Sequence, residues 1–127
     1  QDRDVTILNP RRADWDPTWD QTPDNPEFAA QVKWELDGMD AADTVVFYFP
    51  ASAKAQVTLL EFGIYGTPQK GVVFCAPGYW RAGNVQLVAK RRGVPLYADH
   101  DEFVTAIQVK QNRTFADCLP RTPLRRT

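Results

Sequence analysis

Short runs of β-branched and aromatic residues alternate with longer amphipathic segments along most of this chain, and this alternation restricts the folds that it can adopt. The runs that we expect to form buried strands are residues 5–8, 44–49, 71–76 and 94–97. The segments that we expect to form helices are residues 28–42, 57–65, 85–92 and 101–109. Strands that alternate with helices pair in parallel through right-handed crossovers, so that helices cover both faces of the sheet. The sequence therefore predicts a three-layer α/β domain with four parallel strands.

Proline, glycine and aspartate residues set the ends of several elements. Pro50 ends the second predicted strand because proline cannot donate to a strand ladder. Gly93 follows the third predicted helix, where a left-handed cap favours glycine. Pro95 predicts that the last strand lies at an edge of the sheet. Either Asp99 or Asp101 could cap the last helix.

Composition excludes several classes of protein. The 127 residues suit one domain, and the net charge of −1 gives no reason to expect binding to nucleic acid. No apolar run approaches the roughly 18 residues that a membrane helix needs. Cys75 and Cys118 lack the spacing of a zinc site and are typical of a reducing compartment. We therefore expect an intracellular protein, in the cytoplasm or in an organelle after loss of a leader, with no metal and no cofactor.

The composition changes near the C-terminus, so we expect an α/β domain over residues 1–110 and a basic tail over residues 111–127. The tail has a single acid, Asp117, and four arginines: Arg113, Arg121, Arg125 and Arg126. Most tails of this kind are solvated and flexible. The alternative is a docking arm for an acidic partner.

Two glutamates are candidates for catalysis. Ligands of a parallel α/β sheet bind beyond the carboxyl ends of the strands, and Glu61 lies in the first turns of the helix that follows the second predicted strand. An ionised carboxylate at that position can attack a sugar carbon. Glu35, in the first predicted helix, could supply the acid for a leaving base. Most helix glutamates with this spacing are only solvated, and spacing alone favours that interpretation for both.

Other polar and aromatic residues near this edge of the sheet could bind a substrate. Arg11 and Arg12 could grip a phosphate, or they could pair with the aspartates nearby. Trp15 could stack on a base or pack within the long loop of residues 11–26. Trp80 and Asn84 lie in a turn that enters a helix, which suits an anion or a partner but is also common in ordinary loops.

Four stretches of the sequence resemble the nucleoside 2-deoxyribosyltransferase-like proteins. They are NPRRADWD at residues 9–16, QVKWEL at 31–36, LLEFG at 59–63 and GYWRAGNV at 78–85. The likeness runs in the same order from about residue 5 to residue 107. The first and the last stretch are fairly specific, whereas the LLE sequence alone is not.

The resemblance implies a flavodoxin-like fold and the transfer of 2-deoxyribose between bases, or its hydrolytic variant, on a 2-deoxynucleoside or nucleotide. It matches Glu61 to the nucleophile of the family and Glu35 to a carboxylate that handles the base or its proton. The residues that we expect to bind substrate are Asn9, Arg11, Arg12, Trp15, Asp37, Trp80 and Asn84. Members of the family usually form dimers or larger rings, so self-association is expected if the protein is an enzyme.

Three departures from the family pattern suggest an alternative function. We find no segment before residue 5 that could form the family's first strand, which is central in the flavodoxin-like order, so we expect this strand to be missing. Residues 53–56 read AKAQ where many members carry a polar or acidic residue shortly before the nucleophile, and the basic tail extends past the usual end. One hypothesis is therefore an active enzyme. The other is an accessory or scaffold subunit of a larger assembly that keeps the enzyme fold, and a nucleotide sensor without turnover is a third.

Overall fold

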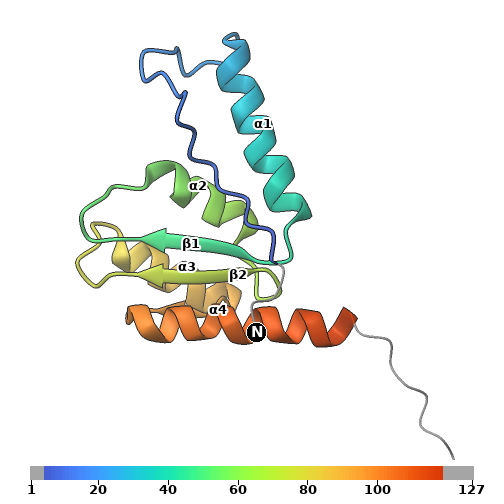
Figure 1. Cartoon of the computed structure of the whole chain (residues 1–127). Helices are drawn as coiled ribbons and strands as arrows, with labels where there is room; N and C mark the ends of the chain where they lie inside the picture. The colour runs from blue at the N-terminus through green and yellow to red at the C-terminus, as the bar shows by residue number, and fades with distance from the viewer. Residues whose placement is uncertain (1–4, 119–127) are drawn as a thin grey trace, which may run out of the picture. The chain divides into compact units, whose positions relative to one another are not determined.

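A computed structural model describes residues 5–118 of the chain, with side chains for residues 5–112 (Figure 1). The chain divides into two compact units, residues 1–42 and residues 43–127. The second unit contains the sheet, and the first contains a loop and one long helix. Each unit is described by itself.

A parallel three-stranded sheet forms the centre of the second unit. Its strands are β1 (Val45–Phe49), β2 (Gly71–Cys75) and β3 (Leu96–Tyr97), in the order β1-β2-β3. Val45 pairs with Gly71, and Val73 pairs with Leu96. The prediction of a parallel α/β sheet is confirmed. The expectation of buried strands holds fully for β2 only, because β1 buries alternate residues and β3 is partly buried.

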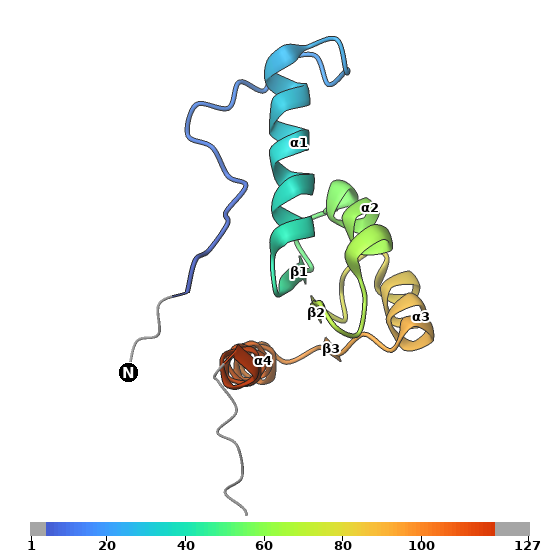
Figure 2. The same ribbon diagram turned by 90° about the vertical axis from the view of Figure 1, so that its right-hand side faces the viewer.

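Three helices pack on this sheet: α2 (Gln56–Tyr65), α3 (Ala82–Arg92) and α4 (His100–Cys118). On one face, Phe62 of α2 packs edge-on against Phe47 of β1, with ring centroids 5.3 Å apart. On the other face, Phe103 of α4 packs with Val72 and Phe74. Figure 2 looks nearly along the strands and shows α2 and α3 on one side of the sheet and α4 on the other.

The predicted end signals are found in the structure. Gly93 adopts a left-handed conformation, with φ 68°, and ends α3. Of the two cap candidates, Asp99 caps α4, because its side chain accepts a hydrogen bond of 2.9 Å from the backbone N–H of Glu102. β3 is short and lies at the sheet edge, as Pro95 predicted.

The sequence-based elements need two corrections. Residues 5–8 form no strand, and Ile7 exposes 82% of its surface. The sheet of residues 5–118 therefore has three strands and not the predicted four. An apolar run sets a side-chain preference, but a strand also needs a neighbour that supplies the ladder, and residues 5–8 pair with none. The last helix also continues to Cys118, past its expected end at Val109, so the predicted tail begins as helix. Arg121, Arg125 and Arg126 lie outside the described residues.

The first unit consists of a long loop and helix α1 (Pro26–Ala41). Asn25 caps this helix: its side chain accepts hydrogen bonds from the backbone N–H groups of Glu27, at 3.1 Å, and Phe28, at 3.2 Å. The ring of Trp15 lies 5.1 Å from that of Trp19 and 6.4 Å from that of Phe28. The loop is therefore packed by its own aromatic residues.

Candidate functional site

The loops that follow β1 and β2 are joined at the carboxyl end of the sheet. The backbone carbonyl of Lys54 accepts a hydrogen bond from the hydroxyl of Tyr79 and another, of 2.9 Å, from Nε1 of Trp80. Tyr79 is buried, with 3% of its surface exposed, and burial raises the pKa of its hydroxyl. The hydroxyl therefore stays a neutral donor, and the two hydrogen bonds join the loops into one rim beyond the strands.

Glu61 lies on α2, the helix that follows this rim. Its neighbour Phe62 is 3% exposed, and the Phe62 ring lies 5.3 Å from that of Phe47 and 6.0 Å from that of Phe49. Glu61 itself is half-buried. Because Phe62 fixes the rotation of α2 on the sheet, the backbone position of Glu61 is fixed too. The helix begins after Ala55, which has a positive φ of 47°, and no side chain caps its start.

Trp80 lies on the rim near two cations. The residue exposes 47% of its surface, with the Arg81 guanidinium 4.4 Å and the Lys54 ammonium 5.9 Å from the ring centroid. Asn84, on the first turn of α3, is exposed. This part of the rim offers positive charge, an aromatic surface and an amide, a combination that suits an anionic or aromatic ligand.

A hydrogen-bonded chain connects the loop of the first unit to α1. Arg12 forms a bidentate ion pair with Asp14: Nε donates to Oδ1 at 3.0 Å and Nη2 to Oδ2 at 2.7 Å. Nη1 of Arg12 donates to Oε1 of Gln31 at 3.4 Å. The amide nitrogen of Gln31 donates to Oε1 of Glu35 at 3.3 Å and to the carbonyl of Pro10 at 3.1 Å. The hydrogen bond with Asp14 raises the pKa of Arg12, and the same bond lowers the pKa of Asp14.

The remaining predicted residues of this unit have separate environments. The Asn9 side chain accepts a hydrogen bond of 3.0 Å from the backbone N–H of Arg11, while the side chain of Arg11 is exposed. Trp15 packs against the rings of Trp19 and Phe28. Packing within the loop was one of its two predicted roles, and stacking on a base was the other. Asp37 pairs with Lys33 on α1. The structure thus brings Arg12 and Glu35 together through Gln31, and it leaves Arg11 and Asp37 outside that chain of contacts.

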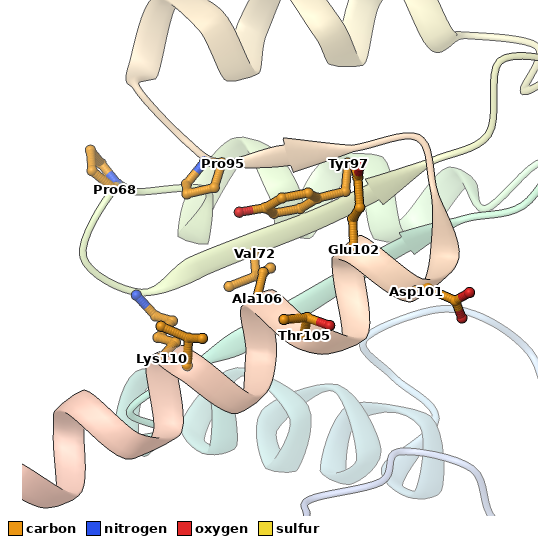
Figure 3. A pocket seen from close by; sticks show the side chains of 10 residues that line it. Pro68, Val72, Pro95, Tyr97, Asp101, Glu102, Thr105, Ala106 and Lys110 are labelled. Atoms are coloured by element: carbon orange, nitrogen blue, oxygen red, sulfur yellow. The ribbon is translucent and has the colours of Figure 1, made fainter.

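One hollow lies on the α4 side of the sheet. It has a volume of about 650 Å³, and Figure 3 shows its walls, which are Pro68, Val72, Pro95, Tyr97, Asp101, Glu102, Thr105, Ala106, Val109 and Lys110. None of the predicted site residues lines it. Glu61, Trp80 and Asn84 belong to elements that pack elsewhere, so the hollow is not the candidate site.

Sequence reasoning missed Gln31 and Tyr79, whereas pairing of Arg12 with a nearby aspartate was one of its two interpretations, and Asp14 is that aspartate. Gln31 carried a signal, because it lies three residues after Phe28 and four before Glu35 and therefore shares a side of the helix with both. A polar residue at such a position is a candidate for a buried hydrogen bond. Tyr79 carried no signal of this kind, because its acceptor is a main-chain carbonyl on a distant loop.

These observations define an α/β protein with a parallel sheet and a glutamate on the helix that follows its first strand. Comparison with protein families gives a match to the nucleoside 2-deoxyribosyltransferase-like family over residues 1–79, which is more than half of the chain. The chain belongs to this family, and the resemblance read from its motifs is confirmed. No curated protein matches the chain. Within the described part of the chain, no helix is both long and apolar enough to cross a membrane.

Proposed function

We propose that this protein cleaves the N-glycosidic bond of 2-deoxynucleosides or their phosphates and transfers the sugar to another base or to water. One observation carries the proposal: the region that matches the family, residues 1–79, includes both Glu35 and Glu61. The anchoring of α2 through Phe62 supports it, because a nucleophile must be held in a fixed place to be effective.

In the proposed mechanism, a carboxylate oxygen of Glu61 attacks the anomeric carbon as the bond from that carbon to the base nitrogen breaks. Glu35, in its acid form, gives its proton to the departing base. The sugar is then an ester of Glu61. An incoming base or water attacks the same carbon, Glu35 takes up the proton, and Glu61 leaves as a carboxylate, with net retention of configuration. The mechanism requires both carboxylates to reach one sugar, which stays a prediction.

We expect the substrate to be held by Asn9, Arg11, Arg12, Trp15, Asp37, Trp80 and Asn84. Trp80 and the cations beside it are suited to a base or a phosphate. Arg12 is already engaged by Asp14 and Gln31, so the exposed guanidinium of Arg11 is the better candidate for an anionic group.

The experiment is base exchange by purified protein. A 2-deoxynucleoside is incubated with a different free base, and products are separated by chromatography. We expect exchange or base release by the wild type, none by Glu61→Gln, and full activity of Glu102→Gln, a control on α4. Mass spectrometry should find a 2-deoxyribosyl adduct on the peptide that contains Glu61. A wild type with neither turnover nor adduct contradicts the proposal.

A second candidate function, an accessory subunit of a protein assembly, is favoured by the outer edge of β1. Among the described residues β1 pairs with β2 alone, its sequence VVFYF has no charge, and Val46 and Tyr48 are 46% and 44% exposed. An uncharged edge of this kind is open to pairing with another strand. This candidate predicts no base exchange by the purified protein. It also predicts that the backbone N–H groups of Val46 and Tyr48 are protected from hydrogen exchange in the assembly and not in the isolated chain.

A further inference from the structure

Gln31 is the one polar side chain that is buried among the residues that the structure describes, with 8% of its surface exposed. A buried amide without partners costs about 1–3 kcal/mol. Such a group persists in a protein when its hydrogen bonds are satisfied, and the bonds of Gln31 are made to residues of both the loop and α1.

The three hydrogen bonds of Gln31 fix the direction of its amide. The nitrogen gives one hydrogen to the carbonyl of Pro10 and the other to Glu35, and the oxygen accepts from Arg12. A reversed amide would turn its oxygen toward two acceptors and its nitrogen toward a donor, and all three bonds would be lost. Gln31 therefore has one orientation in this network.

This orientation connects two residues whose side chains could otherwise move independently. Arg12 is held from the other side by the bidentate pair with Asp14, so it provides a fixed point. Gln31, which accepts from Arg12, also donates a hydrogen bond to the carboxylate of Glu35, four residues further along the same helix. Glutamate side chains lose substantial rotamer freedom when they are held. Here the loss is incurred during folding, before any substrate binds.

We propose that Gln31 is a positioning residue that holds the Glu35 carboxylate and the Arg12 guanidinium in a single arrangement. The role of this arrangement in turnover rests on the proposed function, in which Glu35 moves the proton of the base. Outer partners of metal-binding side chains typically change activity by about 10–100-fold when they are removed, and we expect an effect of that order here.

Two variants separate positioning from packing. Gln31→Glu keeps the size of the side chain and can still accept from Arg12, but its carboxylate has no hydrogen to donate to Glu35 or to the carbonyl of Pro10. Gln108→Glu makes the same chemical change at an exposed position on α4 and is the matched control. With a 2-deoxynucleoside as substrate, we expect Gln31→Glu to lower kcat about 10–100-fold with KM little changed, and Gln108→Glu to alter neither. An unchanged kcat for a folded Gln31→Glu protein overturns the proposal.

A second measurement does not depend on activity or on the folding of Gln31→Glu. In nuclear magnetic resonance spectra of the full chain, the side-chain amide signals of Gln31 should move in Glu35→Gln and in Arg12→Gln, and stay unmoved in Glu102→Gln. Signals that do not respond to Glu35→Gln overturn the positioning contact. A wild type without turnover contradicts the proposed function instead, and the amide signals still decide whether Gln31 holds Glu35.

Discussion

Gly63, on α2, and Gly66, at the C-cap of that helix, should respond in opposite directions to the same substitution, although they lie three residues apart. A Cβ added at Gly63 would have no heavy atom within 4 Å, whereas a Cβ added at Gly66 would lie 2.5 Å from the carbonyl oxygen of Phe62 and 2.7 Å from two atoms of its ring. The Phe62 ring cannot yield easily, because it is buried between Phe47 and Phe49. Gly63→Ala is therefore free of steric conflict, and Gly66→Ala is not.

The magnitudes follow from these contacts. Alanine is about 0.8–1 kcal/mol more favourable than glycine inside a helix, so Gly63→Ala should stabilise the protein by about that amount. Overpacking costs about 1–3 kcal/mol, which sets the expected loss for Gly66→Ala. The entropy that alanine removes from the unfolded chain is common to both variants and cancels in their comparison. The two should thus differ by about 1–3 kcal/mol, the cost of overpacking at Gly66.

Urea unfolding followed by far-ultraviolet circular dichroism measures this difference directly. For a domain of about 60–100 residues, 1 kcal/mol corresponds to a change in Tm of about 4–8 °C, so thermal unfolding is a second measure. The reasoning is refuted if Gly66→Ala is as stable as Gly63→Ala, because Phe62 would then be free to move. The inference that Phe62 anchors α2, the helix that carries Glu61, would then be wrong as well.

Three further predictions concern other contacts. Tyr79→Phe removes the hydroxyl that donates to the Lys54 carbonyl and should cost about 0.5–1.5 kcal/mol in urea unfolding, and a change below that range would mean that the bond adds little. The hydrogen bond from Arg12 lowers the pKa of Asp14 in the folded protein. The stability that this pair contributes is therefore present above the ordinary aspartate pKa of about 4, and it is lost as the pH falls through the lower pKa of Asp14 in the folded state. Tryptophan fluorescence of the loop should change in that acid range in the wild type and change less in Asp14→Asn, and equal curves would contradict the pairing. Burial raises the pKa of the Cys75 thiol, so in a Cys118→Ser variant iodoacetamide should label Cys75 slowly at pH 8 and quickly in urea, whereas fast labelling without urea would show that the thiol is accessible.

Much of the second unit could be predicted because its signals are local. Residues 44–49 and 71–76 combine β-branched and aromatic side chains with a following proline or an alanine-proline pair, and both form strands. Gly93 and Asp99 act within their own turn, so their roles could be predicted from neighbouring residues. Pro95 likewise marks an edge strand through its own missing N–H group.

The features that could not be predicted depend on partners far along the chain. Residues 5–8 have the composition of a strand, but their sequence does not say whether another strand is present to pair with them. Gln31 is buried because Pro10 and Arg12, in the loop, form hydrogen bonds with it. Helical periodicity does not indicate contacts with residues so far along the chain. Glu35 and Glu61 were chosen from their motifs, and the shared pocket assigned to them stays a prediction.

The contact that unites the two rim loops has an acceptor that no substitution can remove. Tyr79 and Trp80 both donate to the main-chain oxygen of Lys54, and every amino acid supplies that oxygen. Position 54 can therefore change its charge, for example to glutamate, and alter the electrostatics around Trp80 while the loops keep their geometry. Natural variation or engineering at this single site could adjust ligand preference at little structural cost, whereas positions 79 and 80 have no such freedom.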